Sequence, residues 1–163
     1  MTGTDRALRA RVLDFEIEAA FVAGPVAAKN LESQPAFSEQ LVLIAPKSAP
    51  RIRTPRDIGR TTVIAFGAGC SYRRCLEQWL AGAGVVPEQV MEFSSYHAIV
   101  ACVASGAGIA MVPRSVLHAV TLGNEVSANR LPAKIAAAQT VLTWRKGHQS
   151  IALHALREKL RPR

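Results

Sequence analysis

Strand-like and helix-like segments alternate along almost the whole chain, and this alternation is the feature that most constrains its fold. Residues 62–66 are mostly apolar and rich in branched side chains, which is typical of a buried strand. Glycines follow, and apolar residues then recur at helical spacing until Gly82. The same unit repeats with a strand at 90–93 and a helix that Ser94 or Ser95 caps. The pattern predicts an α/β fold with a mainly parallel sheet.

Further elements extend the alternation in both directions, with a polar loop expected between the Gly24-Pro25 turn and residue 40. Thr54-Pro55 is expected to begin one helical turn, and Ser150 to cap the last helix. The other predicted strands are 18–23, 40–45, 109–112 and 140–144, and the other predicted helices are 4–13 and 115–120.

Composition narrows the class of protein. The 163 residues are 49% hydrophobic and 20% charged, as in a globular domain rather than a disordered one. No apolar run reaches the roughly 18 to 20 residues that span a bilayer, and the first residues lack the apolar core of a secretory signal. A cytoplasmic protein without membrane contact is therefore expected. The three cysteines lack zinc-site spacing, which predicts reduced thiols, no metal site and no cofactor.

The net charge of +8 raises the question of nucleic-acid binding. The cations are dispersed over polar helix faces and loops, without a helix-turn-helix pattern or interleaved aromatic residues. We interpret them as a solvated basic surface, and do not expect this chain to bind DNA directly.

The starts of two helices are the candidate binding site. Backbone N–H groups at 70–73 and 95–98 carry the partial positive charge of a helix N-terminus, which favours a carboxylate or a similar anion. Serine hydroxyls at these positions add donors, although each serine could also be a plain helix cap. The candidate ligand-binding residues are Thr4, Gly24, Gly69, Cys70, Ser71, Ser94, Ser95 and Tyr96.

Sequence signatures of catalysis are weak. The four histidines do not form an HExxH motif, no serine lies in a Gly-x-Ser-x-Gly elbow, and Gly67-Ala68-Gly69 lacks the third glycine of a dinucleotide fingerprint. The carboxylates show no pairing for acid–base chemistry. We therefore predict a binding protein rather than an enzyme, with no catalytic residues.

Several motifs, in order, resemble the effector-binding domain of LysR-type transcriptional regulators, from about Thr4 to Leu160. The most specific is Val103-x-Ser-Gly-x-Gly-Ile-Ala-Met-Val-Pro113. The other matching pieces are the segment from Gly3-Thr4 through Val12 to Phe15-Glu16-Ile17-Glu18-Ala19-Ala20-Phe21, the 39–46 strand and Gly69-Cys70-Ser71-Tyr72-Arg73.

The resemblance implies a fold like that of periplasmic binding proteins, with two α/β subdomains joined by two crossing strands. Subdomain I would comprise 1–45 plus 139–163, and subdomain II 46–138, with the crossings at 41–45 and 140–144. A small anionic effector would bind in the cleft between them, near Cys70, Ser71 and Ser95. Partners would be a second copy of the chain, and DNA through a helix-turn-helix domain that is absent here. A solute-binding protein of the same fold is an alternative.

The chain also departs from the family pattern. Glu18 stands where the family usually has a shorter acidic residue, and the opening strand and helix of subdomain I are missing. An unpaired sheet edge and an uncovered apolar face are expected to result. The chain would then be a fragment, a truncated gene product, or a domain completed by association.

Cys70 suggests a redox sensor as a further alternative. A thiol at a helix N-terminus beside Arg73 and Arg74 is expected to have a lowered pKa, and the resemblance places Cys70 where peroxide-sensing members carry their reactive cysteine. Cys75 lies five residues further along the same helix, where Cα atoms are about 8 to 9 Å apart and beyond disulfide reach.

Overall fold

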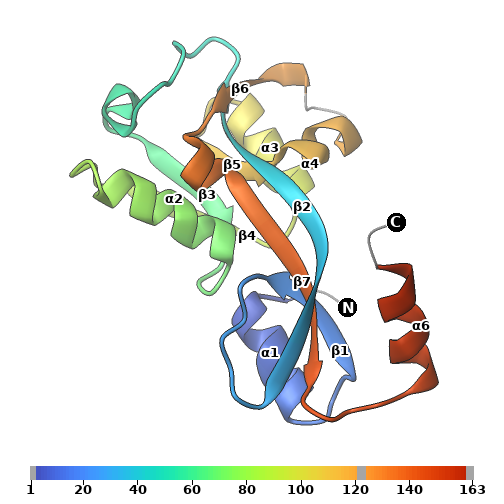
Figure 1. Cartoon of the computed structure of the whole chain (residues 1–163). Helices are drawn as coiled ribbons and strands as arrows, with labels where there is room; N and C mark the ends of the chain where they lie inside the picture. Colours follow the sequence, from blue (N-terminus) through green and yellow to red (C-terminus); the bar gives the residue numbers. More distant parts are fainter. Residues whose placement is uncertain (1–2, 121–123, 161–163) are drawn as a thin grey trace. The chain divides into compact units, whose positions relative to one another are not determined.

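The computed structural model describes residues 3–120 and 124–160, which fall into two compact units (Figure 1). Unit 1 comprises Met1–Glu39 and Ala138–Arg163, and unit 2 comprises Gln40–Ala137. Two strands, β2 (Leu31–Pro46) and β7 (Ala137–Arg145), contribute residues to both units. Each unit has its own apolar core.

Unit 1 is built on an antiparallel sheet. Strand β1 (Ala19–Ala23) pairs with β7, with Ala19 opposite Trp144 and Ala23 opposite Thr140, and β2 lies on the other side of β7. Helices α1 (Asp5–Leu13) and α6 (Ile151–Lys159) complete the unit. Because neighbouring residues of a strand face opposite sides of a sheet, Val141 packs with the α1 cluster and Leu142 with the α6 cluster.

Two aromatic residues of unit 1 stay in contact with solvent. The Phe21 ring of β1 packs at 5.3 Å from the Phe37 ring of β2, and the two residues are 40% and 51% exposed. Among the described strands, β1 pairs with β7 alone. The edge strand β1 therefore carries one ring of this exposed aromatic pair, and β2 carries the other.

Unit 2 contains a mixed sheet. Strands β3 (Thr62–Phe66) and β4 (Gln89–Phe93) are parallel, with Phe66 opposite Phe93. A parallel bridge between Val63 and Ile109 places β5 (Ala110–Pro113) beside β3. Strand β2 runs antiparallel to β5 and to β6 (Val126–Arg130). The strands therefore follow each other in the order β4, β3, β5, β2, β6.

Helices cover both faces of the unit 2 sheet, with α2 (Ser71–Ala81) on one face and α3 (Tyr96–Ala104) and α4 (Arg114–Ala119) on the other (Figure 1). Two short helices, η1 (Pro55–Ile58) and α5 (Ala133–Ala136), lie in connections. One buried cluster joins strand and helix residues: Val42, Ile44, Ile64, Ile99, Val100, Val103, Ala110, Val112, Val120 and Val126.

The expectation of a mainly parallel sheet is wrong. The pairings of β1 with β7 and of β2 with β5 and β6 are antiparallel, and parallel pairing is confined to β3, β4 and the start of β5. The predicted polar loop is also wrong, because β2 begins at Leu31 rather than near residue 40. Side-chain bonds support this polar half: Glu32 accepts from the Thr143 hydroxyl through its carbonyl and from the Trp144 indole through its carboxylate, each at 2.9 Å.

Strand β6 and helix α5 were also not predicted, because the sequence between 124 and 136 shows no clear strand or helix pattern. The sequence of β6 is polar, yet Asn129 is buried. Its side-chain oxygen accepts from the Ile52 N–H at 2.9 Å, and its amide donates to the Ser127 hydroxyl at 3.4 Å. These bonds offset the cost of burying an amide.

Candidate functional site

Two helix N-termini of unit 2 begin at the same edge of the sheet. Because β3 and β4 are parallel and in register, both chains leave the sheet at the carboxyl edge and enter helices there. Cys70 is the N-cap of α2 and Ser95 is the N-cap of α3. The Phe66 ring at the end of β3 packs edge to face on Tyr96, the first residue of α3, at 4.7 Å between centroids. This contact links the two helix starts.

Neither N-cap side chain caps its helix. The side chains of Cys70 and Ser95 make no capping hydrogen bond, so the reading of Ser95 as a plain cap is not supported. The first N–H groups of an α-helix have no intrahelical acceptor and attract anions. The edge therefore combines two such N-termini, of 11-residue and nine-residue helices, with the nearby hydroxyls of Ser71, Ser94 and Ser95.

Gly69 shapes the approach to α2. Its φ is +98°, a backbone conformation that residues with a side chain rarely adopt. The Cys70 N–H donates to the Gly67 carbonyl at 3.3 Å. A side chain at position 69 would strain this turn. Gly69 therefore has a structural reason to be glycine at the point where the chain reverses into the helix.

Arg73 is held by groups from three elements. Its guanidinium donates to Glu77 on α2 at 2.7 Å, to the carboxylate of Glu92 on β4, and to the Phe66 carbonyl at 3.3 Å. These bonds to Glu77 and Glu92 raise the pKa of Arg73 above its ordinary value. Two carboxylates thus offset the charge of Arg73, and Arg74 is the exposed cation of this first turn.

Cys70, Cys75 and Cys102 form no disulfide and are partly buried. Burial raises the pKa of the Cys75 thiol, against a smaller opposing effect of Arg74. Burial thus disfavours the thiolate of Cys75, which is the nucleophilic form of a cysteine. The redox alternative depends on Cys70 at the helix start.

Thr4 and Gly24, the other two candidate residues, belong to unit 1 and have structural roles there. The Thr4 hydroxyl accepts from the Ala7 N–H at 3.3 Å and so caps α1. Gly24 precedes a cis peptide bond to Pro25, and its N–H donates to the Gln139 carbonyl at 2.7 Å. A β-carbon on Gly24 would lie 2.8 Å from the Val141 side chain, so close packing requires glycine.

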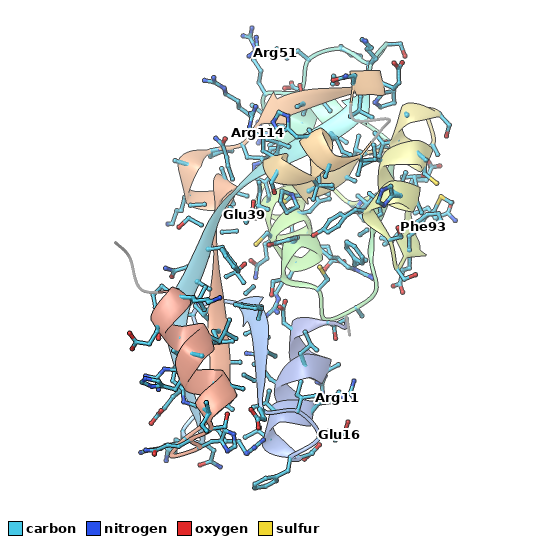
Figure 2. All side chains as sticks on the ribbon, turned by 90° about the vertical axis from the view of Figure 1, so that its right-hand side faces the viewer. Arg11, Glu16, Glu39, Arg51, Phe93 and Arg114 are labelled. Carbon is cyan, nitrogen blue, oxygen red and sulfur yellow. The ribbon has the colours of Figure 1, made fainter. Side chains whose placement is uncertain are left out.

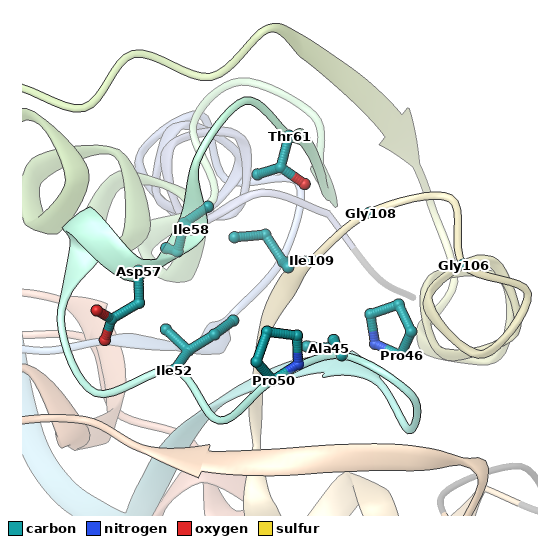
Figure 3. Close-up of a pocket in the computed structure, with 11 residues that line it drawn as sticks. Ala45, Pro46, Pro50, Ile52, Asp57, Ile58, Thr61, Gly106, Gly108 and Ile109 are labelled. Atoms are coloured by element: carbon teal, nitrogen blue, oxygen red, sulfur yellow. The ribbon is translucent and has the colours of Figure 1, made fainter.

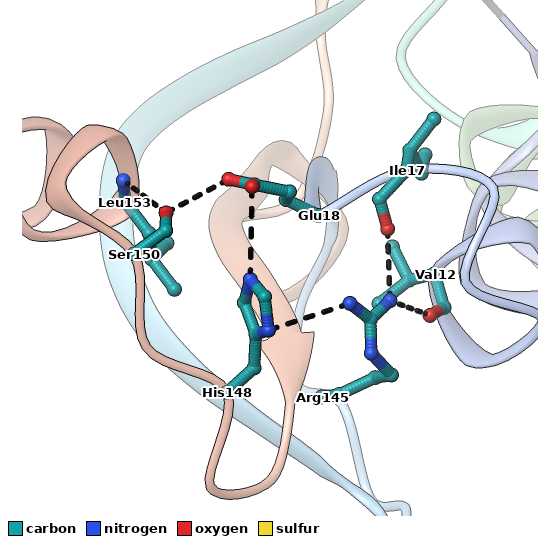
Figure 4. Close-up of polar contacts among 7 residues, drawn as sticks. All are labelled: Val12, Ile17, Glu18, Arg145, His148, Ser150 and Leu153. Atoms are coloured by element: carbon teal, nitrogen blue, oxygen red, sulfur yellow. Dashed lines mark hydrogen bonds and ion pairs between the residues drawn. The ribbon is translucent and has the colours of Figure 1, made fainter.

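Sequence reasoning missed a polar cluster in unit 1 (Figure 4). The Ser150 hydroxyl donates to Glu18 at 2.8 Å and accepts from the Leu153 N–H at 3.1 Å, while His148 lies 3.9 Å from Glu18 and 3.5 Å from Arg145. A serine, a histidine and an acid are thus close together. In a catalytic triad the serine contacts the histidine. Here Ser150 instead contacts Glu18 and caps α6, so the three residues do not have the geometry of a triad.

A shallow pocket of about 200 Å³ in unit 2 was also missed (Figure 3). It lies where β2 ends and β3 and β5 begin, which is the sheet edge opposite the two helix starts. Its lining residues come from 45–61 and 106–109, and no local motif connects these segments. They are Ala45, Pro46, Ala49, Pro50, Ile52, Asp57, Ile58, Thr61, Gly106, Gly108 and Ile109.

Among residues 3–120 and 124–160, no group of three or more His, Cys, Asp or Glu side chains could hold a metal ion. In the same residues, no helix has the length and apolar character needed to cross a membrane.

Comparison with known proteins identifies the family. The model of the LysR substrate binding domain matches residues 1–163. The transcriptional regulator CzcR of Bacillus cereus is 33% identical over 144 residues, which are 88% of this chain and 49% of CzcR. The chain thus spans about half the length of the curated relatives it matches.

Solved structures share the fold at low identity. The regulatory domain of CcmR from Synechocystis, in complex with 2-PG, matches 96% of this chain and 78% of its own with a TM-score of 0.83 and 19% identity. The sulfate-bound regulatory domain of an OxyR2 mutant from Vibrio vulnificus matches 96% and 75% with a TM-score of 0.74 and 17% identity. The chain adopts the periplasmic-binding-protein-like α/β fold of LysR regulatory domains. It is an effector-binding domain of the LysR family of transcriptional regulators, a family that is not enzymatic.

Proposed function

We propose that this domain senses a small anionic effector at the carboxyl edge of β3 and β4 and thereby modulates transcription. The observation that carries the proposal is the pair of helix N-termini at one edge, joined by the Phe66–Tyr96 contact. An anion there accepts N–H donors of α2 and α3 and offsets the positive ends of both helix dipoles. The candidate contacts are Gly69, Cys70, Ser71, Ser94, Ser95 and Tyr96.

Proteins of the same fold support this ligand class. The OxyR2 structure contains sulfate, and the CcmR structure contains 2-PG. In the proposed complete regulator, a helix-turn-helix domain outside this chain contacts DNA, and two copies associate.

The balance of charge at this edge also favours an anion. Glu77 and Glu92 offset the charge of Arg73, whose side chain therefore orders the loop. The remaining positive potential comes from the helix N–H groups and from exposed Arg74. Ser95, whose hydroxyl makes no capping bond, is available to donate to the ligand.

A thermal-shift screen of sulfate, phosphate and small mono- and dicarboxylates tests the proposal. Ligands that bind the folded state raise Tm by mass action. Ser95→Asp places a carboxylate at the start of α3, where it favours the helix and repels an anion. We expect the variant to keep its Tm and lose the ligand-induced shift.

Ser48→Asp is the matched control, because Ser48 is exposed and follows β2 at the opposite sheet edge. It should retain the shift. Absence of a shift with every compound, or equal loss in both variants, would contradict the proposed site.

A further inference from the structure

The connection between β2 and β3 borders the pocket of unit 2 and supplies most of its lining residues (Figure 3). Pro50, Ile52, Ile58 and Ile109 make the wall largely apolar. The bond from the Ile52 N–H to buried Asn129 fixes the connection to β6. The hollow is therefore part of the folded unit, formed by a connection that is itself held in place.

Exposed cations flank the lining residues in the sequence. Arg51, Arg53 and Arg56, here called the basic rim, are exposed and lie next to Pro50, Ile52 and Asp57. Figure 2 shows Arg51 extending away from the body of unit 2. Among the residues that the structure describes, none of the three forms an ion pair within 4 Å. Lys47, also exposed, donates to the Asn124 carbonyl at 3.0 Å, which leaves its charge uncompensated.

Three carboxylates near the pocket require consideration. Asp57 lines it, and one of its oxygens accepts the N–H groups of Arg53 and Thr54, each at 2.8 Å. Its negative charge also attracts the positive charge of Arg53, so Asp57 offsets part of the positive charge of the rim. Glu88 lies 3.4 Å from Arg60, and this exposed pair is close to neutral. Glu125 follows the carbonyl that Lys47 contacts. The connection still carries a surplus of positive charge at its exposed side.

We propose that the basic rim and the hollow together form a docking surface for an acidic segment of a partner protein, with one apolar side chain seated in the hollow. Two features select this occupant. The charge of the rim is complementary to carboxylates, which steer association and fix its orientation. The hollow, at about 200 Å³, is smaller than the roughly 300 to 1,000 Å³ of typical small-molecule pockets, and suits a single anchoring side chain.

The docking surface is separate from the proposed effector site. Strand β2 is antiparallel to β5, which runs parallel to β3, so the pocket lies at the amino edge of β3 while α2 and α3 start at its carboxyl edge. Failure of one proposal therefore does not entail failure of the other.

Fluorescence anisotropy of the chain with labelled peptides tests the inference. The probes are a twelve-residue Glu- and Asp-rich peptide with one central Phe, the same peptide with Ala in place of Phe, and a twelve-base-pair DNA duplex of mixed sequence. We expect the Phe peptide to bind at least about fivefold more tightly than the Ala peptide, since the anchor fills the hollow. It should also bind more tightly than the duplex, whose phosphates offer no apolar anchor.

Charge-reversal variants locate the surface. Arg51→Glu/Arg53→Glu/Arg56→Glu should weaken binding of the Phe peptide by more than about tenfold. The control, Lys29→Glu/Lys146→Glu/Lys159→Glu, changes the net charge equally at exposed sites of unit 1 and should change affinity by less than about twofold. Ala49→Leu, which keeps all charges, narrows the hollow and should remove the preference for Phe over Ala.

Several results would overturn the inference. Equal loss in the two triple variants would show attraction by net charge alone, and equal binding of the Phe and Ala peptides would show that the hollow is unused. Tighter binding of the duplex would assign the surface to nucleic acid. If the unchanged chain bound neither peptide, the proposed docking surface would be rejected. Circular dichroism of each variant separates lost binding from lost folding, and Ala49→Leu provides the test should the triple variant unfold.

Discussion

The guanidinium of Arg73 on α2 bonds the carboxylate of Glu92 on β4, and so links the first turn of a helix to the strand that leads into the next helix. The Arg73 side chain is 16% exposed, whereas Glu77 and Glu92 are 43% and 53% exposed. Solvent therefore screens both ion pairs, so each contributes little to the free energy of unfolding. Their main effect is to fix the position of α2 relative to β4.

Arg73→Met should lower the free energy of unfolding by about 1 kcal/mol, after allowance for this screening. It should also weaken binding of whichever anion shifts Tm, because the two helix starts lose their common link. Urea denaturation and the thermal-shift assay measure these effects. Arg74→Met is the control for lost charge, since Arg74 is exposed; an equal stability loss there would contradict the assignment.

Ser150 and Ser95 occupy the same N-cap position in different surroundings. The Ser150 hydroxyl accepts from the Leu153 N–H, whereas Ser95 makes no capping bond. Ser150→Ala should therefore destabilise the chain by about 1 kcal/mol, and Ser95→Ala by much less. Urea midpoints of the two variants give the comparison. A larger loss for Ser95→Ala would show that its hydroxyl already has a structural partner.

Much of unit 2 could be predicted from the sequence because its signals are local. The strand at 62–66, the helix ending before Gly82 and the Arg73–Glu77 pair at i, i+4 each depend on residues near one another in the chain. The helix starts at Cys70 and Ser95 follow from glycines and serines after apolar strands. Their meeting at one edge follows from parallel pairing.

What could not be predicted depends on partners distant in sequence. The polar first half of β2 is a strand because Thr143 and Trp144 bond to Glu32, over a hundred residues away. The burial of Asn129 depends on its hydrogen bond from the Ile52 N–H, and the Arg73–Glu92 pair joins residues 19 positions apart. The pocket likewise combines two distant segments. Periodicity contains no information on such contacts.

Gly108 is required by the close approach of two strands. A β-carbon at this position would lie 2.3 Å from the Thr62 carbonyl oxygen, where the backbone bonds of Ile109 join β3 to β5. Gly108→Ala should therefore cost about 1–3 kcal/mol of stability, because backbone must move. At Gly67 the nearest atom is a Glu92 carboxylate oxygen at 3.5 Å, so Gly67→Ala should be nearly neutral. Thermal denaturation of both variants tests the contrast, and a neutral Gly108→Ala would show that β3 and β5 separate easily.

The thiol of Cys75 should ionise at higher pH than an exposed cysteine, because burial disfavours its thiolate. A chain with Cys70→Ser and Cys102→Ser leaves Cys75 as the single thiol, and keeps the burial that dominates the shift. Its alkylation rate should rise with pH at a higher midpoint than that of a free thiol. Faster reaction than a free thiol at pH 7 would contradict this.

The converse chain, with Cys75→Ser and Cys102→Ser, isolates Cys70 and tests the redox alternative. A sensor thiol should react with hydrogen peroxide faster than free cysteine at pH 7. Mass spectrometry of sulfenic acid trapped by dimedone measures the rate. A rate at or below that of free cysteine would remove the redox alternative and leave anion sensing untouched.

Asp57 should make the stability of unit 2 depend on pH in the acidic range. Its carboxylate accepts the N–H groups of Arg53 and Thr54, and these bonds lower its pKa. A pKa lowered by folding gives stability that is complete above the pKa of the unfolded chain, about 4, and is lost as pH falls through the lower folded value. Asp57→Asn should therefore lower the urea midpoint at pH 6, and the difference from the unchanged chain should shrink towards pH 2. A difference independent of pH would show that the carboxylate charge plays no part in holding the connection over the pocket.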